Sequence, residues 1–207
     1  MNMSQPGLRR DEQARGRIRQ CRASDFYSIL AIIEEAAEAY RGAIPEDCWH
    51  EPYMPEEALR NEIARGVSFY GYEMSGELIG VMGWERVLNA LLIRHAYVRR
   101  SAQGRGIGTL LLDRLRDTYR DQWLVGTWAD ATWAIRFYQR NGFQLLDAPV
   151  AARLLETYWA ITRRQMEVSV VLACPRLTDA DAAALIAASI AETHLIKPPG
   201  GPAEGKP

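Results

Sequence analysis

The chain has 207 residues, of which 48% are apolar, and its formal net charge is −1. This composition suits one folded domain, and a nearly neutral chain has no overall attraction to nucleic acid or to anionic membranes. No apolar run approaches the ~18 residues of a membrane span. The three cysteines lack metal or redox spacing, so we expect free thiols, no bound metal and a soluble cytoplasmic protein without a signal peptide.

The spacing of apolar residues predicts helices and strands along most of the chain. In chain order, we expect strand 18–21, helix 26–40, helix 56–65, strands 67–74, 77–85 and 91–98, helix 107–121, strand 123–128, helix 132–141, strand 143–146, helix 153–159, strand 164–172 and helix 179–193. Ser75 and Gly76 form a hairpin turn between two strands. Glu34, Glu35 and Glu38 are expected to face water, opposite the apolar stripe of their helix.

This order of elements predicts a folded domain between two less regular ends. The expected division is a disordered tail at residues 1–16, a domain at residues 17–174, and an Ala-rich helix with a flexible tail at residues 175–207. Inside the domain, segment 41–55 is irregular and carries the aromatic residues Trp49 and Tyr53. These rings either line a substrate pocket or cover the edge of the sheet.

A glycine-rich turn joins strand 91–98 to the next helix. Its glycines are Gly104, Gly106 and Gly108, and the arginines beside it are Arg99, Arg100 and Arg105. Glycine lets a ligand approach the backbone, and the first amides of a helix are unpaired at the positive end of its dipole. The turn is therefore a candidate phosphate site, although the glycines could instead make only a tight turn.

The spacing of the glycines narrows the choice of phosphate ligand. The Walker loop is absent. A dinucleotide fingerprint needs Gly-x-Gly-x-x-Gly directly after a strand, whereas here the pattern is Gly-x-Gly-x-Gly and five residues separate Val98 from Gly104. A nicotinamide-dinucleotide-binding protein remains an alternative.

Two motifs resemble those of the GNAT acyltransferase superfamily. Gln103-Gly104-Arg105-Gly106-Ile107-Gly108 resembles its Gln/Arg-x-x-Gly-x-Gly/Ala loop, and the segment 134–143, AIRFYQRNGF, resembles its Ala-x-x-Phe-Tyr-x-x-x-Gly-Phe helix. The motifs occur in the family's order, and the resemblance covers about residues 17–174. One position departs from the pattern, because Ala131 stands where the family often has a cofactor-contacting Asn.

The resemblance implies an α/β (α+β) fold of the bacterial single-domain type. Its central sheet would be mixed and mostly antiparallel, with a splay between two parallel strands and helices on both faces. Proteins of this family are often dimers, and strand 164–172 is a candidate for edge pairing in a homodimer.

By the same resemblance, the chain would be an acetyl-CoA-dependent N-acetyltransferase. An amine, either a small molecule or a protein amino group, would attack the thioester directly. The cofactor-binding residues carried over from the family are Ala96, Tyr97, Val98, Gln103, Gly104, Arg105, Gly106, Ile107, Gly108, Thr109 and Phe137. The acidic residues Glu46, Asp47 and Glu51 either attract a cationic amine or form a solvated loop.

The resemblance also assigns Tyr138 as the acid that protonates the departing thiolate, because a phenol is protonated at pH 7. The base that deprotonates the amine is open: His95 titrates near neutrality, Glu85 ends the preceding strand, and a water chain could replace both. A rival interpretation is a non-catalytic module that binds or senses acyl-CoA.

Overall fold

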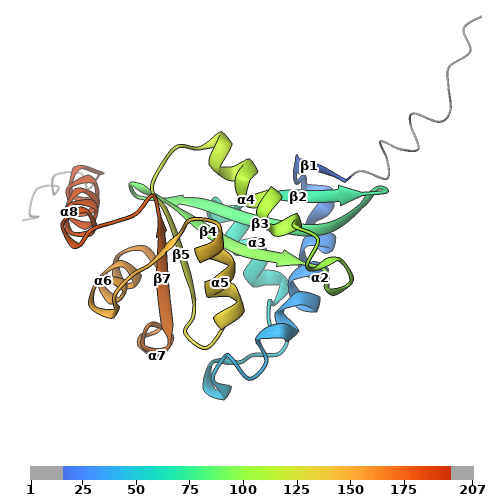
Figure 1. The fold of residues 1–207 in the computed structure, drawn as a ribbon, viewed down its shortest axis with the longest axis horizontal. Coiled ribbons are helices and arrows are strands. Elements are labelled where there is room, and N and C mark those ends of the chain that lie inside the picture. Colours follow the sequence, from blue (N-terminus) through green and yellow to red (C-terminus); the bar gives the residue numbers. More distant parts are fainter. Residues whose placement is uncertain (1–15, 197–207) are drawn as a thin grey trace, which may run out of the picture.

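The computed structural model describes residues 16–196, and within this range the strands form one seven-stranded sheet (Figure 1). The strands are β1 Arg17–Gln20, β2 Ser68–Met74, β3 Glu77–Val87, β4 Ala90–Val98, β5 Trp123–Trp128, β6 Gln144–Leu145 and β7 Ser169–Cys174. Their spatial order is β1-β2-β3-β4-β5-β7-β6, and neighbouring strands are antiparallel except for the pair β4 and β5. The mixed, mostly antiparallel sheet is thus confirmed, whereas almost all of the predicted N-terminal tail lies outside the described residues.

Helices cover both faces of this sheet. They are α2 Phe26–Ala37, α3 Glu56–Arg65, α4 Ile107–Thr118, α5 Thr132–Arg140, α6 Ala148–Tyr158, α7 Arg163–Glu167 and α8 Asp179–Ile196, with short 3-10 helices η1 Ala23–Asp25, η2 Glu38–Tyr40, η3 Glu46–Cys48 and η4 Arg100–Ala102. The apolar contacts place α4 and α5 on one face, and α2, α3, α6 and α8 on the other. No described helix has the length and apolar character needed to cross a membrane.

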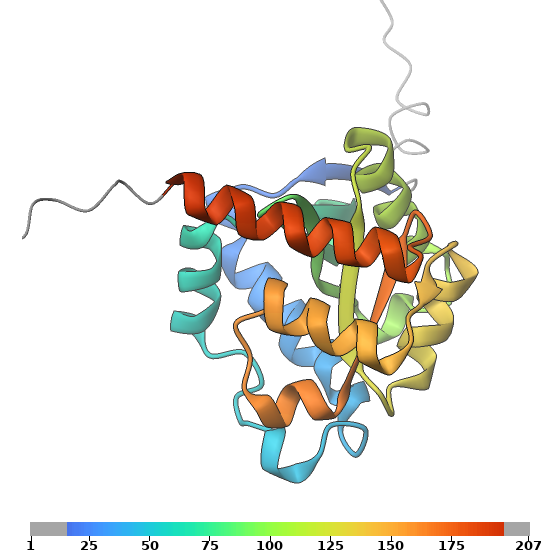
Figure 2. The same ribbon diagram turned by 90° about the vertical axis from the view of Figure 1, so that its left-hand side faces the viewer.

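Successive side chains along each strand point to opposite faces of the sheet, so each strand contributes to the core on both faces. On β2, Tyr70 belongs to the cluster under α4, whereas its neighbour Phe69 packs under α2. On β4, Leu91 belongs to the α4 side and Leu92 to the cluster under α6. Helix α8 lies beside α6 (Figure 2), and the Asn89 side chain donates to the Leu185 carbonyl at 2.9 Å.

Strands β4 and β5 separate soon after they begin. They pair only at Leu91 with Trp123 and at Leu92 with Leu124. Farther along, β4 carries a bulge, because its register with β3 passes from Arg94 directly to Tyr97. His95, inside the bulge, has a φ of 47°, which is rare for a residue with a side chain. The implied splay is confirmed, and it opens the sheet beyond Leu92.

The predicted strand 164–172 is wrong in its first half. Thr162 and Gln165 form a reciprocal capping box that starts α7, and the strand begins only at Ser169. Strand β7 then lies between β5 and β6 rather than at an edge. It therefore does not offer the free edge on which the predicted pairing between subunits depended.

Two of the three glutamates expected to face water hold loops instead. Glu34 accepts hydrogen bonds from the backbone amides of Tyr53 (3.3 Å) and Met54. Glu35 binds the Arg99 guanidinium at 2.5 Å and the Arg100 amide at 2.9 Å. Helix α2 thus anchors segment 41–55 and the start of the glycine-rich turn. The apolar stripe of α2, from which the helix was predicted, gives no sign of this role.

Other predicted bounds need smaller corrections. Helix α6 begins at Ala148, five residues earlier than predicted, with Pro149 in its first turn, where proline is tolerated. Helix α4 ends at Thr118 rather than near residue 121. The C-terminal helix starts where predicted, because Thr178 and Asp181 cap each other's backbone amides. The domain bounds themselves stay a prediction.

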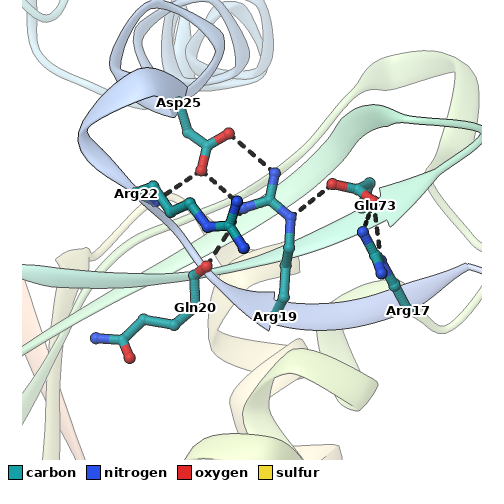
Figure 3. A network of polar contacts seen from close by, with 6 residues as sticks. All are labelled: Arg17, Arg19, Gln20, Arg22, Asp25 and Glu73. Atoms are coloured by element: carbon teal, nitrogen blue, oxygen red, sulfur yellow. Dashed lines mark hydrogen bonds and ion pairs between the residues drawn. The ribbon is translucent and has the colours of Figure 1, made fainter.

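A network of charged residues fixes the edge strand β1 to the rest of the fold (Figure 3). The Arg19 guanidinium binds Asp25 of η1 at 2.7 Å and 2.9 Å, and Glu73 of β2 at 2.5 Å. Arg17 binds the other oxygen of Glu73 but is 72% exposed, compared with 21% for Arg19. The hydrogen bonds from Arg19 lower the pKa of both Asp25 and Glu73.

We expect Arg19→Ala to lower the free energy of unfolding by about 1–2 kcal/mol, because Asp25 loses its guanidinium partner and Glu73 loses one of its two. Arg17→Ala, the matched control, should change it by less than about 0.5 kcal/mol. Since both carboxyl pKa values are lowered in the folded state, the Arg19 contribution is complete above about pH 4 and is lost as the pH falls further. Urea unfolding of the three proteins at pH 7 and pH 3 measures this, and equal effects of the two substitutions would contradict it.

Candidate active site

The glycine-rich turn has the backbone that a phosphate site requires. Gly104 and Gly106 have φ values of 76° and 78°, and Gly106 is the N-cap of α4. Nothing lies within 4 Å of the place where a Cβ would stand on either glycine. Gly108 has another role, because a Cβ there would lie 3.2 Å from the Phe137 ring. The first two glycines therefore leave room for a ligand at the N-terminus of α4, and the third brings α4 and α5 together.

A cavity of about 550 Å³ lies beside this turn, and we refer to it as the cofactor cavity. All but one of the predicted cofactor residues line it: Ala96, Tyr97, Val98, Gln103, Gly104, Gly106, Ile107, Gly108, Thr109 and Phe137. Arg105 is exposed and lies outside the lining. Gln103 donates to the Val98 carbonyl at 3.0 Å, which ties the turn to β4.

The arginines beside the turn are not equivalent. The Arg99 guanidinium is occupied by Glu35 and by the Leu78 carbonyl, at 3.2 Å. Arg100 and Arg105 are exposed. Glu35 is a supporting residue that sequence reasoning missed, because nothing local indicates that a helix far upstream reaches this loop.

A second cavity, of about 230 Å³, lies beyond the splay, and we call it the acceptor cavity. Its lining includes three of the residues predicted for catalysis or substrate binding, Tyr53, His95 and Tyr138, and two of the predicted cofactor residues, Ala96 and Tyr97. Trp49 is not part of the lining; its ring packs against Tyr53 at 5.6 Å. The two cavities share a wall made of Tyr40, Ala96, Tyr97 and Tyr138.

Tyr138 stands on this shared wall and is buried, with 5% of its surface exposed. Within the described part of the chain, its hydroxyl has no hydrogen-bond partner. Burial, together with the nearby Tyr40, raises the pKa of Tyr138 well above its usual value. The phenol is therefore protonated at neutral pH, and its residue lies between the two cavities.

His95 is held by a partner that sequence reasoning also missed. Its Nε2 is hydrogen-bonded to the carboxylate of Glu62 on α3. The imidazole is stacked near Phe69 and Tyr97, with ring centres 6.0 Å and 6.5 Å apart. Burial raises the pKa of Glu62, but the His95 hydrogen bond and the charge of Arg94 outweigh it and leave that pKa lowered. Because an ionised carboxylate can only accept a hydrogen bond, Nε2 carries the hydrogen in this contact.

The remaining predicted residues lie away from the cavities. Glu85 forms an ion pair with Arg94 at 3.3 Å and lines neither cavity. Ala131, in place of the family's Asn, is fully buried at the start of α5 and makes no side-chain cap. Among residues 16–196, no cluster of three or more His, Cys, Asp or Glu side chains could hold a metal ion.

Arginines already pair with two of the acidic residues in segment 41–55. Asp47 binds Arg164 at 2.7 Å, and Glu51 binds Arg41 at 2.8 Å. These contacts lower the pKa of both carboxyl groups. The predicted attraction of this segment for a cationic amine is therefore largely cancelled.

Residues 32–156 match the family described as Acetyltransferase (GNAT) domain. Because this match spans more than half of the chain, the chain belongs to the GNAT acetyltransferase family. Among curated proteins, UPF0157 protein YqkA of Bacillus subtilis (strain 168) is 30% identical over 117 residues, which are 55% of this chain and 34% of that protein. The chain thus spans about a third of the length of that relative.

Solved structures share the fold. The PaiA N-acetyltransferase from Thermoplasma acidophilum, in complex with coenzyme A, has a TM-score of 0.58 and 19% identity, covering 77% of this chain and 98% of its own. The ribosomal-protein-S18-alanine N-acetyltransferase from Escherichia coli has a TM-score of 0.56 and 16% identity, and the match covers 80% of this chain and 97% of that protein. A GNAT family acetyltransferase from Elizabethkingia anophelis with acetyl-CoA bound has a TM-score of 0.50 and 16% identity, and the match covers 76% of this chain and 96% of that protein.

We expect Gly106→Ala to weaken CoA binding at least about tenfold, because the methyl group disfavours the left-handed backbone and blocks the approach of a ligand to the amides. Gly76→Ala is the matched control, since Gly76 also has a positive φ (87°) with open space around it but lies in the β2–β3 hairpin. Titration calorimetry with CoA measures both. Equal affinities of the two variants would show that the turn is structural only.

Proposed function

We propose that the protein is an acetyl-CoA-dependent N-acetyltransferase whose reaction takes place at the wall shared by the two cavities. The observation that carries this proposal is the position of Tyr138 and of the β4 bulge between a cavity with a phosphate-binding turn and a cavity open to a second substrate. The relatives solved with CoA or acetyl-CoA support the identity of the first ligand.

The cofactor cavity has the groups that a CoA thioester needs. The free amides at the start of α4, around Gly106, would hold the pyrophosphate. Ala96, Tyr97 and Val98 line the cavity along β4, where the splay leaves that edge of the strand unpaired beyond Leu92. A pantetheine arm can pair with a free strand edge as another strand would. When bound, acetyl-CoA supplies an activated acyl group.

The residues of the shared wall divide the remaining chemistry. The amine forms the new C–N bond as the C–S bond breaks. The main-chain amide of Ala96 is our candidate donor to the negative charge on the thioester oxygen, because the bulge takes Ala96 out of register with β3. Tyr138 donates its proton to the departing thiolate.

His95 is our candidate for the base that takes the proton from the amine. It lines the acceptor cavity, whereas Glu85 does not. If Glu62 accepts the Nε2 proton, the other ring nitrogen is the unprotonated one that a base needs. A water chain is the competing route, and it would make the rate insensitive to His95.

The proposal leaves two other classes as rivals. A non-catalytic acyl-CoA sensor would bind CoA without turnover, and a dinucleotide-binding protein would bind NAD rather than CoA. The cytoplasmic location and the homodimer stay predictions.

We expect Tyr138→Phe to lower kcat about 100-fold or more, the typical effect of losing a general acid, with little change in CoA affinity. Tyr70→Phe is the matched control, because Tyr70 is a buried tyrosine that lines neither cavity. CoA thiol release measures turnover. Unchanged turnover in Tyr138→Phe would remove the phenol from the mechanism.

We expect His95→Asn to lower kcat/KM about 100-fold at pH 7, since Asn tolerates the positive φ at this position but supplies no base. The deficit should shrink as the pH rises, because more of the amine is then already neutral. Glu62→Gln should have a smaller effect in the same direction. A pH–rate profile parallel to that of the native protein would favour the water chain.

A further inference from the structure

Six aromatic rings from separate parts of the chain line the acceptor cavity. They are Tyr40 of η2, Tyr53 of segment 41–55, Tyr97 of β4, Trp128 of β5, Tyr138 of α5 and Trp159 after α6. Tyr97 contacts two of these rings, with centres 6.1 Å from Tyr40 and 6.4 Å from Tyr53. Rings brought together from six segments offer flat faces against which another ring can stack.

One wall of this cavity depends on a glycine inside a strand. A Cβ at Gly126 of β5 would lie 3.2 Å from the Trp159 indole, closer than ordinary contact. A glycine in a strand interior often marks such a close approach. Because Gly126 has no side chain, the Trp159 indole can pack directly against β5 beside the splay. Both Gly126 and Trp159 line the acceptor cavity.

The lining of the acceptor cavity offers no free carboxylate to pair with the second and third ammonium groups of a polyamine. No Asp or Glu belongs to its lining, and the ionisable cations there are Arg94 and His95. The nearby carboxylates are already engaged, Glu62 by His95 and Arg94, and Glu85 by Arg94. Burial raises the pKa of Tyr53 and Tyr97, so their hydroxyls stay neutral.

The size of the cavity disfavours a long substrate. About 230 Å³ is below the range of roughly 300–1,000 Å³ that is usual for drug-sized ligands. The ion pair of Asp47 with Arg164 joins η3 to α7, and the neighbouring residues Tyr53 and Gln165 are part of the lining. This ion pair thus ties the segment that carries Tyr53 to the helix that carries Gln165.

From these features we infer that the acceptor is a compact monoamine with an aromatic or similarly flat apolar body, rather than a polyamine or a basic protein segment. This inference rests on the proposed acetyltransferase function, and it names the acceptor of that same site. The ring of the amine would stack among Tyr53, Tyr97 and Trp159, with its amino group directed at the shared wall.

The test compares three acceptors with acetyl-CoA: 2-phenylethylamine, spermidine and a short peptide with a free N-terminus and a lysine. We expect kcat/KM for 2-phenylethylamine to exceed the other two at least about tenfold. Trp159→Ala should reduce that value about tenfold, mainly through KM, and Gly126→Ala should act in the same direction by displacing the indole. Trp84→Ala, a partly buried tryptophan outside both cavities, is the control.

A second readout separates failure of the inference from failure of the proposed function. Calorimetry measures 2-phenylethylamine binding to the protein saturated with CoA. If 2-phenylethylamine binds, Trp159→Ala weakens that binding and no acceptor is acetylated, the inference is supported and the proposed activity is contradicted. Turnover that favours spermidine or the peptide would overturn the inference and leave the activity intact. Absence of both binding and turnover with 2-phenylethylamine would also overturn it.

Discussion

The separation of β4 from β5 is the constraint on which the rest of the structure depends. Two parallel strands that pair at only two positions leave their other backbone groups available. The bulge at His95 turns β4 away, although a positive φ at a non-glycine residue costs about 1–3 kcal/mol. The Glu62 hydrogen bond and the flanking rings of Phe69 and Tyr97 offset this strain. Both cavities exist because the sheet is open here.

Carboxylates on two helices hold the parts that surround this opening. Glu34 and Glu35 of α2 bind segment 41–55 and the approach to the glycine-rich turn, and Glu62 of α3 binds the bulge. Each accepts hydrogen bonds from a loop or strand rather than facing open water. A single pair of adjacent helices on one face of the sheet thus positions the cofactor loop, one wall of the acceptor cavity and the candidate base.

Local signals allowed much of the fold to be predicted. Helix α3 and strand β5 have the predicted bounds, because Pro55 and Gly66 delimit the helix and aromatic and β-branched residues mark the strand. The strand predicted at 164–172 was wrong in its first half. Met166, Val168 and Val170 alternate with polar residues as in a strand, but the capping box of Thr162 and Gln165 starts a helical turn. Both patterns fit such a short segment, and tertiary packing decides between them.

The cofactor cavity could be predicted from the sequence and the acceptor cavity could not, because the two are built from different kinds of groups. The cofactor cavity uses backbone amides, and exposing them requires glycines at fixed spacing within one short segment, so a motif reveals it. The acceptor cavity uses side chains that lie between residues 40 and 169 and meet only in the fold. Gly126 and Trp159 illustrate the difference: neither is notable alone, and only their contact shows why a strand interior holds a glycine. The sequence could therefore predict the acyl donor, whereas the class of acceptor had to be argued from the assembled walls.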